Sequence, residues 1–199
     1  MTVRTPATKR SRRTRAELAR SAHEQLAQHG TINVEAIAAA AGVSTATFYA
    51  HFATHDDAIA AALDVSLTEV VCVVERLFHI EALIEVGLDE VLRRLVSATH
   101  DVFRSESSIM RAALARISVH RPTREVYRGH EARSLEHLER QIELGQKAGL
   151  LGDGESGKRA ISLLILLQGL HNPLLTKKRI DPVIANDLHA AIHALLTPG

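Results

Sequence analysis

The sequence predicts an all-α protein with an N-terminal three-helix domain and a larger helical domain, about nine helices in all. Alanine and leucine are abundant, whereas the chain has only 11 Gly and 5 Pro, and aromatic residues make up 3% of it. These proportions favour helices over a β-sandwich or barrel, because strands are rich in β-branched and aromatic residues. Apolar residues recur at helical spacing along the chain, and no segment is convincing as a strand or a repeat.

The composition bounds the class of protein. The 199 residues are 46% hydrophobic and 24% charged, which are ordinary values for a globular chain with its own core. The one cysteine, Cys72, excludes an internal disulfide and suits a reducing compartment. No apolar signal segment follows the basic start, and the most apolar stretch, 161–167, is far shorter than the roughly 20 residues that span a bilayer. We therefore expect a soluble, cytoplasmic protein that does not enter a membrane.

Positive charge is concentrated at the N-terminus. Residues 1–55 contain seven lysine and arginine residues and three acids, and all seven cations precede residue 21. A basic segment of this kind neutralises nucleic-acid phosphates or binds another anionic surface. The alternative is a solvated tail that only aids solubility. We expect residues 1–12 to form a disordered basic arm.

Three short helices are expected in the region that follows the arm. A first helix ends at Gly30, and Asn33 is a good N-cap for a second helix. Gly42 supplies the positive φ of a tight turn, and Ser44 can cap a third helix that runs to about His51. Two short helices joined by a three-residue turn have the size of a helix-turn-helix. A helical hairpin that binds no nucleic acid has the same spacing.

Longer helices are expected beyond this region. Thr54 can cap a helix whose first turn carries Asp56 and Asp57, acids that the helix dipole favours there. Arg121-Pro122 and the glycine-rich stretch 149–157 interrupt the later pattern. The expected helices run over residues 56–77, 88–104, 107–120, 123–148, 156–170 and 182–196.

Residues 37–52, with the sequence IAAAAGVSTATFYAHF, closely resemble the DNA-binding motif of the tetracycline-repressor (TetR) family. That motif has roughly the pattern I-A-x-x-A-G-V-S-x-G-x-x-Y-x-H-F, followed by a short linker into a long helix, and the resemblance covers about residues 13–63. It implies a DNA-binding domain over residues 13–55 within a homodimeric transcriptional regulator, usually a repressor. In such a protein the second domain, residues 56–199, binds a small molecule and releases the DNA.

The resemblance implies that the third helix lies at the DNA. Hydroxyl and methyl groups of Thr45 and Thr47 are suited to base edges, and the phenol of Tyr49 to a phosphate, unless its ring closes the small core. Ala46 stands where glycine is usual in the family. The expected DNA-binding residues are Arg10, Arg12, Arg13, Ser44, Thr45, Ala46, Thr47, Tyr49, His51 and His55.

One departure from the family pattern concerns charge. Residues 21–55 contain no lysine or arginine, and His55 stands where the family commonly has a lysine that grips phosphate. Phosphate contacts must then come from the arm, from hydroxyls, from backbone N–H groups at helix starts, and from protonated His51 or His55. The same absence supports an alternative function, a helical small-molecule-binding protein without sequence-specific DNA binding.

The last two expected helices are candidates for a dimer interface. The segment 161–170 is apolar nearly all round, so it must be buried on both sides, and the final helix has one broad apolar face. The resemblance implies that these helices pair with their twins, unless they only close the core of one monomer. Two-fold pairing places two recognition helices about 34 Å apart, which suits a pseudo-palindromic operator in double-stranded DNA. The expected interface residues are Leu163, Leu166, Leu170, Ile184, Leu188 and Ile192.

The effector site is expected to be mainly aliphatic. Beyond residue 55 the aromatic residues are Phe78, Phe103 and Tyr127, and the chain has no tryptophan. Such a composition offers little stacking for planar cationic compounds and favours a small, flexible, apolar effector. The expected lining residues, each of which could instead be an ordinary core residue, are Phe103, Met110, Leu114, Tyr127, His130 and Leu167.

No motif for catalysis or for a cofactor is present. The sequence has no G-x-S-x-G, no G-x-x-x-x-G-K-[ST] and no G-x-G-x-x-G. His189 and His193 are spaced so that both could reach one metal ion, but no cysteine or recognisable acidic motif joins them. We therefore expect neither enzymatic activity, nor a cofactor, nor a bound metal.

Overall fold

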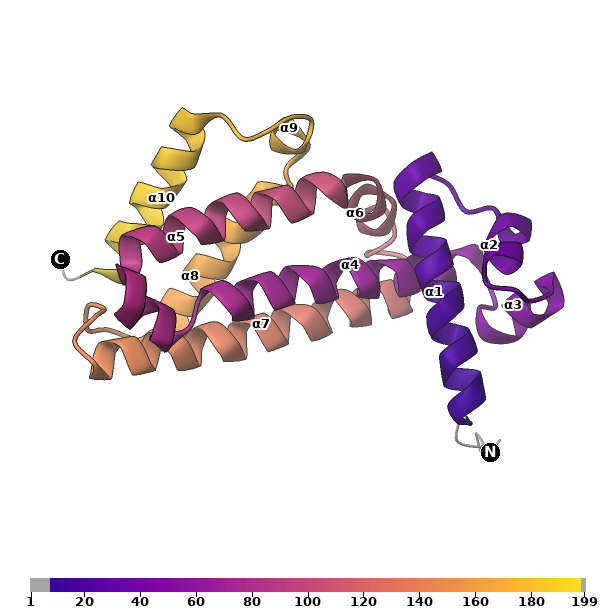
Figure 1. Cartoon of the computed structure of the whole chain (residues 1–199), viewed down its shortest axis with the longest axis horizontal. Helices are drawn as coiled ribbons and strands as arrows, with labels where there is room; N and C mark the ends of the chain where they lie inside the picture. The colour runs from indigo at the N-terminus through magenta and orange to yellow at the C-terminus, as the bar shows by residue number, and fades with distance from the viewer. Residues whose placement is uncertain (1–7, 198–199) are drawn as a thin grey trace. The chain divides into compact units, whose positions relative to one another are not determined.

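The computed structural model describes residues 8–197, and within them it contains ten α-helices, one short 3₁₀ helix and no β-strand (Figure 1). The prediction of an all-α protein is confirmed. None of the helices in this part of the chain is both long and apolar enough to cross a bilayer. The elements are α1 (Lys9–His29), α2 (Val34–Ala40), α3 (Thr45–His51), α4 (His55–Leu77), α5 (Ile80–Ser105), α6 (Ser107–Leu114), α7 (Arg121–Lys147), α8 (Ser156–Gln168), η1 (Gly169–His171), α9 (Pro173–Thr176) and α10 (Pro182–Leu196).

The chain forms two compact units. The described part of the first comprises residues 8–66 and 108–126, and that of the second comprises residues 67–107 and 127–197. Helices α4 and α7 each contribute residues to both units. The expected boundary after residue 55 therefore differs from the observed division, because residues 56–66 and 108–126 group with the N-terminal helices.

Helix α1 begins earlier than expected. Residues 9–12 are helical rather than part of a disordered arm, because the side chain of Thr8 caps the helix by accepting a hydrogen bond from Ser11 N at 3.2 Å. Lysine and arginine, which dominate this first turn, are also good helix formers. Residues 1–7 of the expected arm lie outside the described residues. The helix ends where predicted, at Gly30, which takes the left-handed conformation (φ 70°).

The predicted turn between α2 and α3 is observed. Asn33 Oδ1 accepts a hydrogen bond from Ala36 N at 2.9 Å, and Ser44 Oγ accepts one from Thr47 N at 3.2 Å. Gly42 has a φ of 66°, a value that L-residues rarely adopt. Each cap satisfies a backbone donor that the helix leaves unpaired. These local bonds fix where both helices begin.

Two phenylalanines form the centre of the N-terminal core. Phe48 of α3 and Phe52, which follows the helix, are both fully buried. Their rings meet edge to face, with centroids 5.4 Å apart. Helix α2 packs against both α1 and α3. The other fully buried large side chains of α1–α3 are Leu18, Leu26 and Ile37.

The first turn of α4 links the N-terminal helices to residues 108–126. Thr54 and Asp57 form a reciprocal cap: Asp57 N donates to Thr54 Oγ1 at 3.2 Å, and Thr54 N donates to Asp57 Oδ2 at 2.9 Å. Arg116 Nε donates to Asp56 Oδ1 at 2.5 Å, and His120 Nε2 lies 3.4 Å from Asp57 Oδ1. These contacts explain why residues 108–126 belong to the first unit.

Helix α6 is shorter than expected, and α7 begins earlier. Helix α6 ends at Leu114 rather than His120, and turns follow it. Pro122, expected to break the chain, lies in the first turn of α7 instead. A proline is tolerated there because the N–H that it lacks has no partner in a first turn.

The second unit is built from α5, α8, η1, α9 and α10 with the later parts of α4 and α7. Helix α10 packs against α5 and α8, and α5 packs against η1 and α9. Gly87 (φ 79°, ψ 161°) kinks α5, so the sequence pattern predicted only the part beyond it. Residues 80–86 form a helical segment of their own, capped by His79 Nδ1, which accepts from Ala82 N at 3.3 Å. The fully buried residues here include Leu92, Leu95, Leu138, Ile142, Leu163 and Ile192.

Candidate nucleic-acid interface

Helix α3 has one buried face and one exposed face. Phe48 is its one fully buried residue, whereas Thr45, Ala46 and Tyr49 are exposed. The ring of Tyr49 meets that of Phe48 edge to face at 5.3 Å and is still 51% exposed. Tyr49 therefore packs on the core and presents its other side to solvent. An exposed, short, well-capped helix after a tight turn has the geometry of a recognition helix.

The hydroxyl groups at the start of α3 are already engaged. Ser44 Oγ, which caps the helix, lies 3.0 Å from Thr47 Oγ1. Ser44 thus has a structural role in addition to the DNA contact expected of it. Thr47 is half-buried, and Thr45 is the exposed threonine of the helix. Of the two threonines expected to meet base edges, Thr45 is the more accessible.

Arg15 holds the end of α3, a contact that the sequence analysis missed. Its Nη1 donates to the backbone carbonyl of His51 at 2.6 Å, and its Cζ lies 4.5 Å from the centre of the Phe52 ring. The guanidinium thereby satisfies a carbonyl that the helix end leaves unpaired and complements the negative end of the helix dipole. The sequence did contain one indication of this contact. Arg15 lies three residues before Leu18, so both are on the same face of α1, and Leu18 is buried.

The other expected basic residues are exposed on α1. Arg10, Arg12 and Arg13 all lie on the surface of its first turns, and Arg13 Nε is 3.5 Å from Glu17 Oε1. An exposed i,i+4 pair of this kind contributes little stability, so Arg13 remains available to a phosphate. His55 is exposed as the first residue of α4, and His51 is half-buried at the end of α3.

The residues expected to bind an effector fall into both units. Met110 and Leu114 lie on α6 in the first unit, whereas Phe103, Tyr127, His130 and Leu167 lie in the second. Met110, Phe103 and Leu167 are buried.

The second unit contains polar groups that the sequence analysis did not single out. Thr99 Oγ1 and His171 Nδ1 are buried and have no hydrogen-bond partner within the described residues. Thr99 lies one helical turn before Phe103 on α5, and the ring of Phe103 is 5.7 Å from that of His171. Such orphaned groups are rare and point to a water or a ligand that completes them. The sequence did contain one indication of this: Thr99 and Phe103 are four residues apart, which places them on the same face of a helix.

Tyr127 and Glu131 belong to a second cluster of polar side chains in this unit. Burial, and then the charge of Glu131, raise the pKa of the Tyr127 phenol above its ordinary value. Glu131 Oε1 accepts a hydrogen bond from Gln168 Nε2 of α8 at 2.8 Å. The phenol therefore stays protonated, and so able to donate a hydrogen bond, at neutral pH.

The residues expected at the dimer interface differ in how far they are buried within one chain. Leu163, Leu170 and Ile192 are buried within a single chain, Leu166 and Leu188 are half-buried, and Ile184 is 40% exposed. Helices α8 and α10 nevertheless carry apolar side chains with substantial exposure. These exposed α8/α10 residues are Ile161, Ile165, Val183 and Ile184.

The histidine pair of α10 is used in a protein contact. His189 Nε2 lies 3.1 Å from Asp89 Oδ1 of α5, and its ring is 6.0 Å from that of His193. Within residues 8–197, no group of three or more histidine, cysteine or acidic side chains is arranged to hold a metal ion.

An all-α chain with a capped helix-turn-helix at its N-terminus is typical of one class of proteins, the DNA-binding regulatory proteins. Residues 18–62 match the family model described as "Bacterial regulatory proteins, tetR family". The chain thus carries the N-terminal domain of the tetR family, and the resemblance seen in the sequence is confirmed. A comparison with curated protein sequences finds no match.

Solved structures share the fold over nearly the whole chain. A protein from Mesorhizobium loti assigned to the TetR-family transcriptional regulators has a TM-score of 0.73 at 21% identity, over 94% of this chain and 95% of that one. A TetR transcription regulator from Haloarcula marismortui gives 0.71 at 19% identity, over 92% and 96%. A transcriptional regulator from Saccharomonospora viridis, solved in complex with choline, gives 0.64 at 23% identity, over 92% and 95%. The chain therefore shares the fold of these regulators.

Proposed function

We propose that this protein is a ligand-responsive repressor that a small apolar effector releases from its operator. The observation that supports DNA binding most directly is the exposed face of α3, fixed at one end by the Ser44 cap and at the other by Arg15. A rigid helix of this size fits the major groove, where base edges present a distinct pattern for each base pair. In this proposal the chain has no catalytic role.

The proposed interface separates base reading from phosphate binding. Thr45 and Ala46 supply exposed groups of α3 for base edges, the exposed phenol of Tyr49 is suited to a phosphate, and residues 21–55 contain no lysine or arginine. Phosphate contacts then depend on Arg10, Arg12 and Arg13 at the start of α1, whose long side chains are exposed. Phosphate contacts position a protein on DNA and give binding its salt dependence, whereas base contacts give its specificity.

Replacing Arg10, Arg12 and Arg13 by glutamine together is expected to weaken binding to all DNA and to flatten its salt dependence. Each lost phosphate contact reduces the slope of log K against log salt by about 0.9, so three per subunit reduce it by about 5 in a dimer. The measurement is a salt series of gel shifts on an operator selected in vitro from random DNA.

Two further variants complete this experiment. Thr45→Ala should relax base preference at single operator positions and leave the salt slope unchanged. Arg121→Gln, an exposed arginine outside α1 that pairs with Glu125, is the matched control and should bind as the wild type does. Failure to select any DNA sequence would refute the proposal and favour the alternative, a helical small-molecule-binding protein without sequence-specific DNA binding.

A second copy of the chain is the proposed protein partner, and the exposed α8/α10 residues are its contact. Ile165→Glu is expected to convert the dimer to a monomer in sedimentation at micromolar concentration, because a buried, unpaired carboxylate is costly. Ile84→Glu is the matched control: Ile84 is also exposed (67%, against 61% for Ile165) but lies on the first segment of α5. A wild-type monomer, or a dimer that survives Ile165→Glu unchanged, would contradict this interface.

The proposed effector is apolar with one polar group. The Saccharomonospora viridis regulator holds choline, a quaternary ammonium ion of the kind that aromatic cages bind. This chain has no tryptophan, and beyond residue 55 its aromatic residues are Phe78, Phe103 and Tyr127, which supports an aliphatic compound instead. Its polar group would meet Thr99 and His171, the orphaned groups beside Phe103.

Release from DNA requires that the effector favour one conformation over the other. Helix α4 is continuous from His55, directly after the DNA-binding helices, to Leu77 in the second unit. In the proposed mechanism, effector binding in the second unit displaces α4 and so changes the spacing of the two recognition helices of a dimer. An effector that binds tightly but leaves operator affinity unchanged would contradict this mechanism.

A further inference from the structure

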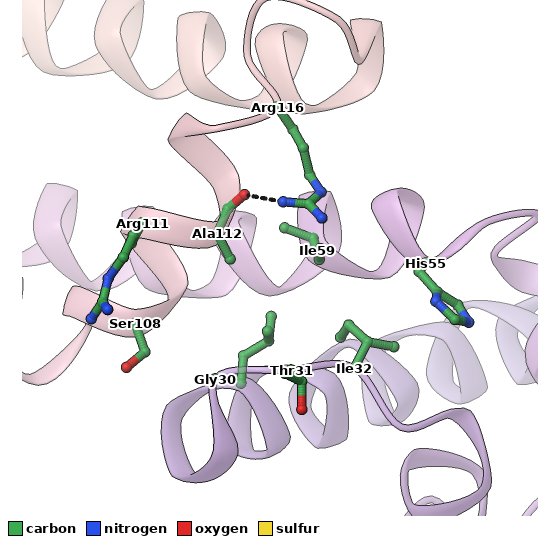
Figure 2. A pocket seen from close by; sticks show the side chains of 10 residues that line it. Gly30, Thr31, Ile32, His55, Ile59, Ser108, Arg111, Ala112 and Arg116 are labelled. Atoms are coloured by element: carbon green, nitrogen blue, oxygen red, sulfur yellow. Dashed lines mark hydrogen bonds between the residues drawn. The ribbon is translucent and has the colours of Figure 1, made fainter.

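The first unit contains a cavity of about 320 Å³ that the proposed function does not use. Figure 2 shows its walls: the loop at Gly30–Ile32 that follows α1, the start of α4 at His55 and Ile59, and the stretch of α6 and its following turn at 108–116. All of these residues belong to the first unit. The volume is at the lower end of the range for small-molecule sites.

The cavity carries positive charge and no carboxylate. Its lining includes Arg111, Arg116 and His55, and none of its lining residues is acidic. Arg116 is held in place, because its Nε donates to Asp56 Oδ1 and its Nη1 donates to the carbonyl of Ala112 at 2.9 Å (Figure 2). Asp56 offsets that one charge. Arg111 makes no ion pair within residues 8–197, so the site keeps a net positive charge.

The rest of the lining limits what kind of anion fits. Leu26, Ile32 and Ile59 give the cavity an apolar wall, and Ser108 offers a hydroxyl on the same helix as Arg111. A guanidinium binds a carboxylate through two parallel N–H···O bonds, and a neighbouring hydroxyl can donate a third. One uncompensated positive charge matches a singly charged anion better than a doubly charged phosphate, which would also leave the apolar wall uncovered.

We propose that this cavity binds a small monocarboxylate with an apolar body. In Figure 2 the side chains of Arg111 and Ser108 lie at one end of the cavity and Ile32 and Ile59 at the other. The carboxylate is bound at the first end by Arg111 and Ser108, and the apolar body extends along the cavity toward Ile59 and Ile32. The occupant contacts α6 and also the loop between α1 and α2, so it stabilises the packing of α6 on the DNA-binding helices. The site is separate from the effector site proposed in the second unit, and occupation of it does not depend on DNA binding.

The test is calorimetry on the DNA-free full chain, with benzoate and hexanoate as probes. Saturable binding with a Kd near or below about 1 mM is expected, with benzyl alcohol and inorganic phosphate at least about tenfold weaker. Arg111→Gln should weaken benzoate binding by about tenfold or more, because it removes a charged hydrogen-bond donor. Arg121→Gln, another exposed arginine of the first unit, should have no effect.

A second variant and a second readout locate the site. Ala112→Leu, which fills the cavity, should abolish benzoate binding while the circular dichroism of the chain stays helical. Benzoate should also shift the amide NMR signals of residues 30–32 and 108–112. No binding of either carboxylate up to about 10 mM, equal binding of benzyl alcohol or phosphate, or unchanged binding by Arg111→Gln would overturn the proposal. Because no DNA is present, such a failure would leave the proposed repressor function untouched.

Discussion

Arg15→Ala is expected to weaken operator binding by about tenfold or more, although Arg15 is not among the residues proposed to contact DNA. The variant loses the hydrogen bond from Nη1 to the carbonyl of His51 and the stacking of the guanidinium on Phe52. Helix α3 has seven residues, too few to be stable without such tertiary contacts. The C-terminal end of α3 then frays, and the exposed residues lose their common orientation.

Arg15→Lys separates positioning from charge. Lysine keeps the positive charge but has no planar group to stack on Phe52 or to reach the carbonyl in the same geometry. If Arg15 positions α3, Arg15→Lys loses affinity while the salt slope of binding stays at the wild-type value. Arg121→Gln, at an exposed arginine outside α1, is the matched control for gel-shift measurements. A lysine variant with wild-type affinity would instead assign Arg15 to a phosphate contact.

Phe48→Ala is expected to lower the free energy of unfolding of the N-terminal helices by about 3–5 kcal/mol, as removal of a large core aromatic side chain does. Phe48 is fully buried, and it contacts both Phe52 and Tyr49 through ring edges. Few other large side chains are available in so small a core to close the space. Urea titration followed by circular dichroism gives the change.

The neighbouring aromatic residue provides the control for this prediction. Tyr49→Ala removes a ring that is 51% exposed and should cost far less stability, while both variants lose operator binding. Stability therefore distinguishes the core residue from the interface residue, although DNA binding does not. A Phe48→Ala protein as stable as Tyr49→Ala would contradict the described packing.

The N-terminal helices were predictable from sequence because local interactions define their ends. Asn33, Ser44 and Thr54 each cap a helix through a bond to a residue three positions later, and Gly30 and Gly42 take the positive φ expected of them. Sequence spacing contains all of this information. The division into units was not predictable, because it depends on Arg116 and His120 reaching Asp56 and Asp57, which are 60 or more residues away.

The less successful predictions concern faces and interruptions of helices. Helix α8 is apolar nearly all round, so its sequence does not distinguish Leu163, which is buried, from Ile165, which is exposed. The helical segment before Gly87 was not predicted, because a single glycine within a helical pattern indicates the end of a helix as readily as a kink. Arg15 was missed because its partners lie 36 and 37 residues away, at the end of α3 and directly after it.

The absence of lysine and arginine between residues 21 and 55 has a consequence for how such a regulator diverges. If the basic residues of α1 supply the charged phosphate contacts, the exposed residues of α3 that face the bases can change without loss of non-specific DNA affinity. Exchanging Thr45 and Ala46 for other side chains would then redirect the protein to new DNA sequences at nearly constant overall DNA affinity. The same separation makes this chain a suitable scaffold for engineered switches.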